Sequence, residues 1–147
     1  MTDVHQMVEA TSLSSIEYFK MHAERDLSFS PDAPVEVSPS YILTVDFQPD
    51  GERFRVLFET DIETTAGHIS CGVAAEYAHP SVILRQASGE AISEFVNNVA
   101  LMHLIPYVRN GVADITQRVF EAPLLMPIFQ RGELNFDVLA SLPKLDA

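Results

Sequence analysis

The side chains that most often carry out chemistry in proteins form no reactive pattern in this sequence. Histidine is a common catalytic base and metal ligand, and the chain has five histidines: His5, His22, His68, His79 and His103. They include no His-x₃-His pair and no zinc spacing with a cysteine. Glycine-rich phosphate-binding motifs and the Gly-x-Ser-x-Gly nucleophile motif are also absent. The sequence therefore predicts no metal site, no cofactor and no enzyme activity.

Two further groups have the right atoms for acid–base or nucleophilic chemistry. Glu59, Asp61 and Glu63 alternate along a predicted strand, so they share one of its faces. Carboxylates act as an acid and a base when burial separates their pKa values, but this face lies opposite the apolar one, and we interpret it as solvated. Cys71 occupies an apolar position of the next predicted strand, which favours a packed side chain over a reactive thiol.

The composition is typical of a single globular domain. The chain has 147 residues, of which 47% are apolar and 20% charged. Nine Lys and Arg against 21 Asp and Glu give a net charge of −12, which argues against nucleic-acid binding and against docking on anionic membranes. One cysteine, with no visible leader or membrane-inserting segment, leads us to expect a cytoplasmic protein. We assign residues 1–14 to a flexible N-terminal arm and residues 15–147 to one domain.

Alternating apolar and polar residues predict four strands. They are expected over residues 15–29, 41–47, 54–63 and 69–77. In the first strand, Phe19, Met21 and Ala23 should share one face. A proline-rich crossover over residues 31–39 precedes the second strand, and a turn signal at residues 66–67 follows the third. Because most of the links between strands are short, the sheet is predicted to be antiparallel.

One long helix is predicted over residues 90–120, and Pro106 should bend it. It would span about 45 Å at 1.5 Å per residue, more than one small sheet needs. Its apolar residues form two stripes on opposite sides of a helical wheel, the first comprising Ile92, Phe95, Val96 and Val99. Because one sheet covers one side, the second stripe predicts an oligomer interface of Leu101, Ile105, Val108, Val112 and Ile115.

Three segments carry more apolar residues than a closed fold requires. The second strand is apolar on both faces near Ile42, residues 124–129 form an apolar loop, and residues 134–142 predict a short amphipathic helix. Each residue taken singly suits a core or a subunit interface. Taken together, they are expected to frame an open groove of low sequence specificity. The candidate residues of these segments are Tyr41, Leu43, Leu125, Phe129, Phe136, Leu139 and Leu142.

The order of these elements and three short motifs resemble the SecB family of export chaperones, over roughly residues 16–142. The motifs are Asp26-Leu27-Ser28-Phe29 followed by Pro31-Asp32-Ala33-Pro34, Leu104-Ile105-Pro106-Tyr107-Val108-Arg109, and Leu134-Asn135-Phe136-Asp137. The resemblance implies an α+β fold with a four-stranded antiparallel sheet packed on one long helix, followed by a short C-terminal helix. It also implies a homotetramer, a dimer of dimers with the helices between the sheets.

The resemblance further implies a function. Members of the family are ATP-independent holdases that bind unfolded or nascent polypeptides in apolar grooves. By family position, the groove here would lie along the second strand (Tyr41, Leu43 and Val45), the crossover and the last helix (Phe136, Leu139 and Leu142). Family members also dock the translocase motor SecA on acidic residues. Asp26 keeps one acidic position, whereas Ser30 and Gly72 stand where family members typically carry acids. One alternative is a dedicated chaperone of an antitoxin in a toxin–antitoxin system, and another is a small-ligand binding domain that uses the apolar cleft.

Overall fold

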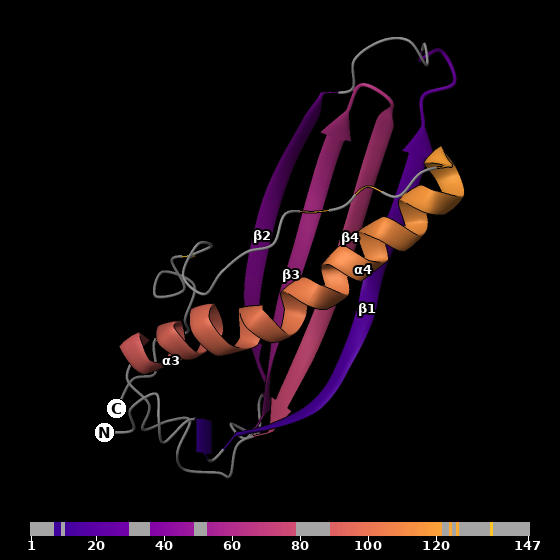
Figure 1. Ribbon diagram of the computed structural model, residues 1–147. Coiled ribbons are helices and arrows are strands. Elements are labelled where there is room, and N and C mark those ends of the chain that lie inside the picture. Colours follow the sequence, from indigo (N-terminus) through magenta and orange to yellow (C-terminus); the bar gives the residue numbers. More distant parts are fainter. Residues whose placement is uncertain are drawn as a thin grey trace.

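The computed structural model describes residues 8–9, 11–29, 36–48, 53–78, 89–121, 124, 126 and 136. Its elements are β1 (Ser12–Arg25), β2 (Val37–Phe47), β3 (Arg53–Thr64), β4 (Gly67–Ala78), α3 (Gly89–Phe95), the π-helical turn η1 (Val96–Ala100) and α4 (Leu101–Phe120). The strands form one antiparallel sheet in the order β1-β4-β3-β2. The helix crosses one face of this sheet diagonally (Figure 1). The predicted α+β fold, with four antiparallel strands and one long helix, is confirmed.

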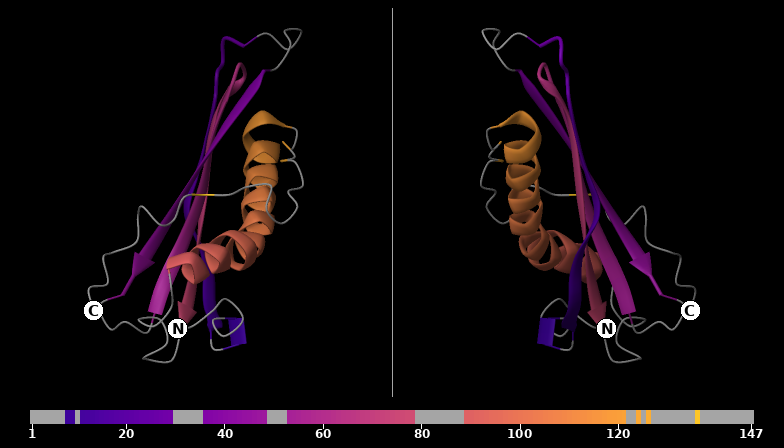
Figure 2. Two further views of the ribbon diagram at one scale, coloured as in Figure 1. Left: turned by 90° about the vertical axis from the view of Figure 1, so that its left-hand side faces the viewer. Right: turned by 90° about the vertical axis from the view of Figure 1, so that its right-hand side faces the viewer.

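The sheet and the helix form two layers (Figure 2). We call the face of the sheet toward the helix the helix-side face and the opposite one the outer face. On β3, the residues Phe54, Val56, Phe58 and Ile62 alternate onto the helix-side face and are buried. The predicted turn at residues 66–67 joins β3 to β4, and a side chain at Gly67, whose φ is +152°, would collide with the carbonyl oxygen of Glu24. Glycine is therefore required at this turn.

The first strand differs from its prediction at both ends. It begins at Ser12 and ends at Arg25, whereas the sequence predicted a start at Ser15 and a continuation to Phe29. Residues 12–14, assigned above to the N-terminal arm, therefore belong to the sheet. After the strand, the Asp26 N–H donates to the carbonyl of Ala66 at 2.8 Å, which ties the end of β1 to the β3–β4 turn.

A β-bulge at Phe19 overturns the predicted alternation of β1. Tyr18 pairs with Val73 and Lys20 pairs with Gly72, so Phe19 is the extra residue. Phe19 consequently lies on the outer face, where a Cβ on Gly72 would come within 2.5 Å of its ring. The prediction that Phe19 shares a face with Met21 is wrong. An aromatic ring fills the space above a glycine that has no side chain, and the bulge is what brings it there.

The two apolar stripes of the helix were predicted on opposite sides, and this is also wrong. Ile92 and Val96 of the first stripe are buried, and so are Leu101, Ile105, Val108 and Val112 of the second, while Ile115 is half-buried. Both stripes belong to one core, so these residues pack against their own sheet instead of lining an oligomer interface.

The π-helical turn accounts for this merging of the stripes. The N–H of Leu101 donates to the carbonyl of Val96, five residues back instead of four. A wider turn of this kind retards the rotation of the helix by one residue, which a helical wheel with a constant angle per residue cannot represent. Pro106, predicted to bend the helix, lies inside α4 on its exposed side, and the irregular turn is η1 instead.

The helix lies closest to β4 and β1, and contacts β3 less. Gly111 permits this approach, because a Cβ there would lie 2.8 Å from Cys71 Sγ and 2.8 Å from the Tyr18 ring. Burial raises the pKa of the Cys71 thiol to about 11, so the thiol stays neutral at ordinary pH. The interpretation of Cys71 as a packed apolar side chain is confirmed.

Candidate functional site

The helix-side face of β2 carries three of the predicted binding residues. Tyr41, Leu43 and Val45 alternate onto this face, where Leu43 lies opposite Phe58 in register. Tyr41 and Leu43 are half-buried, because the helix lies mainly over the other side of the sheet. We define the β2 surface as Tyr41, Leu43, Val45, Phe47 and Phe58. Ile42 points to the outer face and is 51% exposed.

The aromatic rings of the β2 surface form a subsite that contains a residue from the end of the chain. Tyr41 stacks on Phe58 with ring centroids 5.9 Å apart. Phe136 meets Phe58 edge-on at 6.1 Å. Burial raises the pKa of the Tyr41 hydroxyl, which therefore remains protonated and uncharged. The structure thus brings together Tyr41 and Phe136, two predicted binding residues that are far apart in the sequence.

Asn97 of η1 holds Phe136 in this position, and sequence reasoning did not select it. Its side-chain amide donates to the Phe136 carbonyl at 3.1 Å. Its amide oxygen accepts the Phe136 N–H at 2.7 Å. Asn97 is only 4% exposed, and burial of a polar side chain is costly unless it is hydrogen-bonded. An asparagine inside the apolar run from Phe95 to Val99 was the available signal.

Two side chains of α4 form hydrogen bonds with the backbone of residues that follow the helix. The Leu124 N–H donates to Thr116 Oγ1 at 2.7 Å. Arg109 Nε donates to the Met126 carbonyl at 3.4 Å, and Met126 is buried. Leu124 is bonded near the C-terminal end of the helix and Met126 near its middle. Phe136 is bonded to Asn97, before the start of α4. The described residues after α4 therefore lie progressively nearer its N-terminal end and the β2 surface.

Several predicted residues do not belong to this site as described. Leu125, Phe129, Leu139 and Leu142, together with the rest of the predicted short helix, lie outside the described residues. Their role in binding stays a prediction. Of the eight candidates, the structure brings Tyr41, Leu43, Val45 and Phe136 together on one surface.

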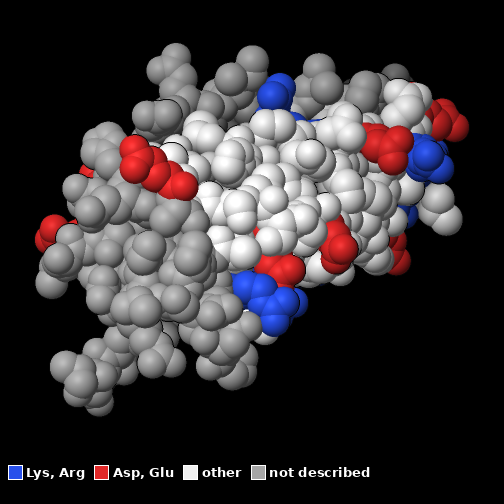
Figure 3. All heavy atoms as spheres, turned by 90° about the horizontal axis from the view of Figure 1, so that it is seen from below, with Lys and Arg blue, Asp and Glu red and all other residues white. Residues whose placement is uncertain are grey.

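The opposite edge of the sheet has an apolar surface that sequence reasoning missed. Leu13, Tyr18 and Met21 lie on the helix-side face of β1, and Tyr107 lies nearby on α4; each is 41–44% exposed. The Tyr18 hydroxyl donates to the Tyr107 carbonyl at 2.8 Å. We define these four residues as the β1 surface. Seen from below, the molecule has a broad uncharged area with both acidic and basic side chains along its margins (Figure 3).

The acidic residues of β3 lie on the outer face, as predicted, and they pair with side chains of neighbouring strands. Asp61 accepts hydrogen bonds from Ser70 and, at 2.6 Å, from His68. The Ser70 bond is the main reason that the pKa of Asp61 is lowered. Glu59 pairs with Lys20 at 3.3 Å. In the part of the chain that the structure describes, no group of three or more acidic, histidine or cysteine side chains is placed to hold a metal ion.

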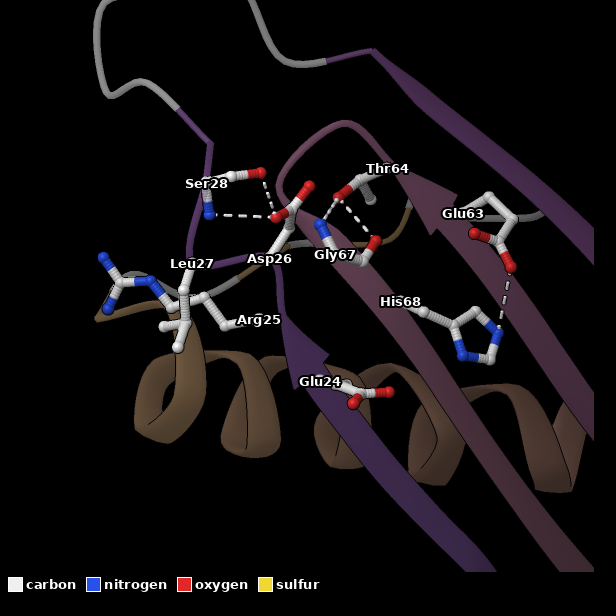
Figure 4. Close-up of a pocket in the computed structure, with 9 residues that line it drawn as sticks. All are labelled: Glu24, Arg25, Asp26, Leu27, Ser28, Glu63, Thr64, Gly67 and His68. Carbon is white, nitrogen blue, oxygen red and sulfur yellow. Dashed lines mark hydrogen bonds and ion pairs between the residues drawn. The ribbon is translucent and has the colours of Figure 1, made fainter.

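Asp26, predicted to dock a partner, lines an open pocket of about 560 Å³ (Figure 4). Its carboxylate accepts the N–H of Ser28 at 2.9 Å and the Ser28 hydroxyl at 2.6 Å, which lowers its pKa. Leu27, on the same rim, is 90% exposed. Gly72 lies beneath Phe19, away from this rim. The lining residues are Glu24, Arg25, Asp26, Leu27, Ser28, Glu63, Thr64, Gly67 and His68.

Comparison with known proteins finds similarity in structure. The chain resembles the Mycobacterium tuberculosis SecB-like chaperone Rv1957, solved in complex with a ChAD peptide from the HigA1 antitoxin. The TM-score is 0.70 at 17% identity, covering 86% of this chain and 96% of that chain. A Streptococcus agalactiae protein of unknown function matches with a TM-score of 0.42 at 9% identity, over 80% of this chain and 97% of that one. No protein-family model and no curated protein sequence matches.

The similarity at a TM-score of 0.70 establishes a SecB-like fold for this chain. Within the described residues, no helix is both long enough and apolar enough to cross a membrane.

Proposed function

We propose that this protein is a SecB-like, ATP-independent chaperone that holds unfolded polypeptides on its β2 surface. One observation carries the proposal: α4 packs mainly on β4 and β1, and beside the apolar face of β2 lies Phe136, which is held through its backbone. A surface covered in this way can be uncovered without unfolding the sheet. The SecB-like fold supports the same function.

The physical basis of holding is the burial of many small apolar areas. Each square ångström of apolar surface removed from water contributes about 25 cal/mol. An unfolded chain can occupy several such subsites at once, and the weak contacts then combine through effective concentration. Apolar contact selects for size and hydrophobicity, so one surface accepts many sequences. No nucleotide is needed for binding of this kind.

The test is suppression of aggregation by the purified protein. A model client refolding from denaturant should stay soluble at about one chaperone tetramer per client, without nucleotide. Leu43→Ser, on the helix-side face, should weaken suppression, while Ile42→Ser, its neighbour on the outer face, should not. No suppression at several-fold excess would contradict the proposal, and so would equal behaviour of the two variants.

A dedicated antitoxin chaperone is the second candidate function. The observation that favours it is the antitoxin peptide bound to the structurally similar Rv1957. This function predicts tight binding to one short apolar segment and weak binding to other polypeptides. A toxin–antitoxin operon next to the gene, together with selective binding of that antitoxin, would decide for it over a general holdase.

A role in protein export is the finer proposal within the holdase function. It rests on the acidic rim around Asp26, whose exposed carboxylate and exposed Leu27 are available to a docking partner. Calorimetric titration with SecA tests this role, with Asp26→Asn expected to weaken binding and Asp46→Asn on β2 as the control. Binding that is absent, or equal in both variants, would leave the holdase without an export role.

We also propose that the chain assembles into a tetramer, through the β1 surface in the first step. Its four side chains are large and apolar and are about two-fifths exposed; three lie on one side of the edge strand β1, and Tyr107 lies on α4. A second copy presents the same strand, and two copies related by a two-fold axis can pair such strands antiparallel. Light scattering should give the mass of four chains at micromolar concentration, and the mass of one chain would contradict assembly.

A further inference from the structure

The amide of Asn97 contacts Phe136 in the way that a neighbouring strand would. It uses one donor and one acceptor on the C=O and N–H of a single residue, at 3.1 and 2.7 Å. Residues of a hydrogen-bonded antiparallel pair exchange the same two bonds. This contact involves only the backbone of the bound residue. It requires that this residue has an N–H, which excludes proline.

The side chain of the residue held by Asn97 enters an aromatic subsite. The Phe136 ring lies edge-on to Phe58, which is fully buried, and Phe58 stacks in turn on Tyr41. Aromatic pairs at such distances gain stability beyond that from area alone. The backbone contact and the ring contact together accept one apolar residue, and aromatic residues fit best. Neither contact depends on the residue belonging to this chain.

We infer that Phe136 is an internal competitor, and that a residue of the client takes its place on Asn97 and Phe58. The inference rests on the proposed chaperone function and assigns it a specific subsite. The client occupant is an extended, aromatic or large apolar, non-proline residue of a non-native polypeptide. The exchange keeps the buried amide satisfied, because the two hydrogen bonds to Phe136 are replaced by two to the client.

Internal competition has a measurable consequence. A tethered residue has a high effective concentration at its own site, so it lowers the apparent affinity for any free competitor. Folded proteins would then bind poorly, and short peptides would bind more weakly than long unfolded chains but measurably. Long unfolded chains, which contact several subsites together, would displace Phe136. Removal of the Phe136 ring should therefore strengthen client binding, whereas removal of an ordinary core residue should not.

The backbone contact can be tested with a peptide that lacks one hydrogen. The probe is a fluorescein-labelled nonapeptide, Gly-Ser-Thr-Val-Phe-Val-Thr-Ser-Gly, compared with the same peptide N-methylated at its Phe; binding is followed by fluorescence anisotropy. In the wild type, N-methylation should weaken binding about fivefold, the effect of one lost hydrogen bond. In Asn97→Ala this penalty should disappear, and in Asn98→Ala, the neighbouring asparagine of η1, it should remain. A penalty that persists in Asn97→Ala overturns the inference.

Two more variants keep the test decisive if Asn97→Ala unfolds. Asn97→Asp keeps the acceptor and loses the donor, so the N-methylation penalty should remain while both peptides bind more weakly. Phe136→Ala should bind the unmethylated peptide several times more tightly than the wild type, and Phe136→Leu should lie between them. Thermal unfolding of each variant reports whether it is folded. Unchanged or weaker binding by a folded Phe136→Ala overturns the inference.

The outcomes separate this inference from the proposed function. Suppose that the wild type suppresses aggregation and binds the peptide, but Asn97→Ala keeps the N-methylation penalty and Phe136→Ala does not bind more tightly. The chaperone function then stands, and the internal competitor is rejected. If the wild type neither suppresses aggregation nor binds either peptide, the proposed function fails and the inference fails with it.

Discussion

The two edges of the sheet both present apolar side chains on the helix side, and yet their surroundings differ. On the β2 surface, Tyr41 and Leu43 are half-buried, and Asn97 holds the backbone of Phe136 against them. On the β1 surface, Tyr18 and its neighbours are 41–44% exposed, and the Tyr18 hydroxyl donates a hydrogen bond to the α4 backbone at Tyr107. The β2 edge thus has a buried amide that binds the backbone of Phe136, whereas the β1 edge presents partly exposed apolar side chains.

This difference indicates that apolar surfaces of similar composition can suit different kinds of partner. An extended polypeptide brings unpaired N–H and C=O groups that need partners, so it suits a surface with a buried amide beside it. A folded partner has already satisfied its backbone and offers mainly side chains, so it suits a plain apolar surface. This contrast supports the proposal that clients bind the β2 surface and that a second copy of the chain binds the β1 surface.

The largest expected effect comes from disrupting the packing of α4, which lies between the two surfaces. Val108 is fully buried beneath the sheet, so Val108→Asp places an unpaired charge in the core. We expect a loss of about 3–5 kcal/mol in the free energy of unfolding, measured by urea denaturation, with both client binding and assembly lost. Asn110→Asp on the exposed side of α4 is the control. Wild-type stability in Val108→Asp would contradict the observed core.

A smaller effect should come from Gly111, where the helix approaches the β1 side. A Cβ at this position would lie 2.8 Å from Cys71 Sγ and from Tyr18, so Gly111→Val overpacks the contact. We expect a cost of about 1–3 kcal/mol in urea denaturation, together with weaker assembly. Cys71→Ala in the same chain should recover part of that stability by making room. If the second substitution adds to the loss, the contact is not the cause.

A paired substitution sharpens the comparison without disturbing the core. Met21→Ser on the β1 surface should lower the mass measured by light scattering and leave client affinity nearly unchanged. Leu43→Ser on the β2 surface should do the reverse, with client affinity falling about fivefold, since a half-buried leucine side chain contributes about 1 kcal/mol. Equal effects of both variants on both measurements would mean that the two surfaces are not separate sites.

The smallest effect concerns the outer face, which neither surface uses. The pKa of Asp61 is lowered in the folded chain, chiefly by its bond from Ser70. Such a carboxylate stabilises the fold above its ordinary pKa of 3.8 and loses this contribution as the pH falls through the lowered value. The melting temperature of the wild type should therefore fall more steeply below about pH 4 than that of Asp61→Asn. Parallel curves would show that Asp61 contributes nothing.

The sequence predicted the regular parts of the fold well. The core strands β3 and β4 were predicted within one or two residues at each end, and the helix, predicted over 90–120, was found over 89–120. The reason is that alternation by two and recurrence every three or four positions are local signals of burial on one face. Surplus apolar residues on β2 and near the end of the chain predicted a groove, and the family resemblance placed Tyr41, Leu43, Val45 and Phe136 in it.

The errors about which face a side chain takes came from two places where a single residue changes the phase of an element. The bulge at Phe19 and the wide turn η1 each move all following side chains relative to a regular strand or helix. Their causes are distant in sequence: Phe19 covers Gly72, and the wide turn places Asn97 against Phe136. Periodicity within one element contains no information about these neighbours.

The sequence by itself determined which segments become strands and helix and which of their residues seek burial, because these depend on spacing along the chain. Only the tertiary structure decided what covers each apolar face. It placed both helix stripes against one sheet, left the β1 surface exposed, and brought Asn97 to the backbone of Phe136. Those outcomes depend on the phase and position of one element over another, which long-range packing and hydrogen bonds fix.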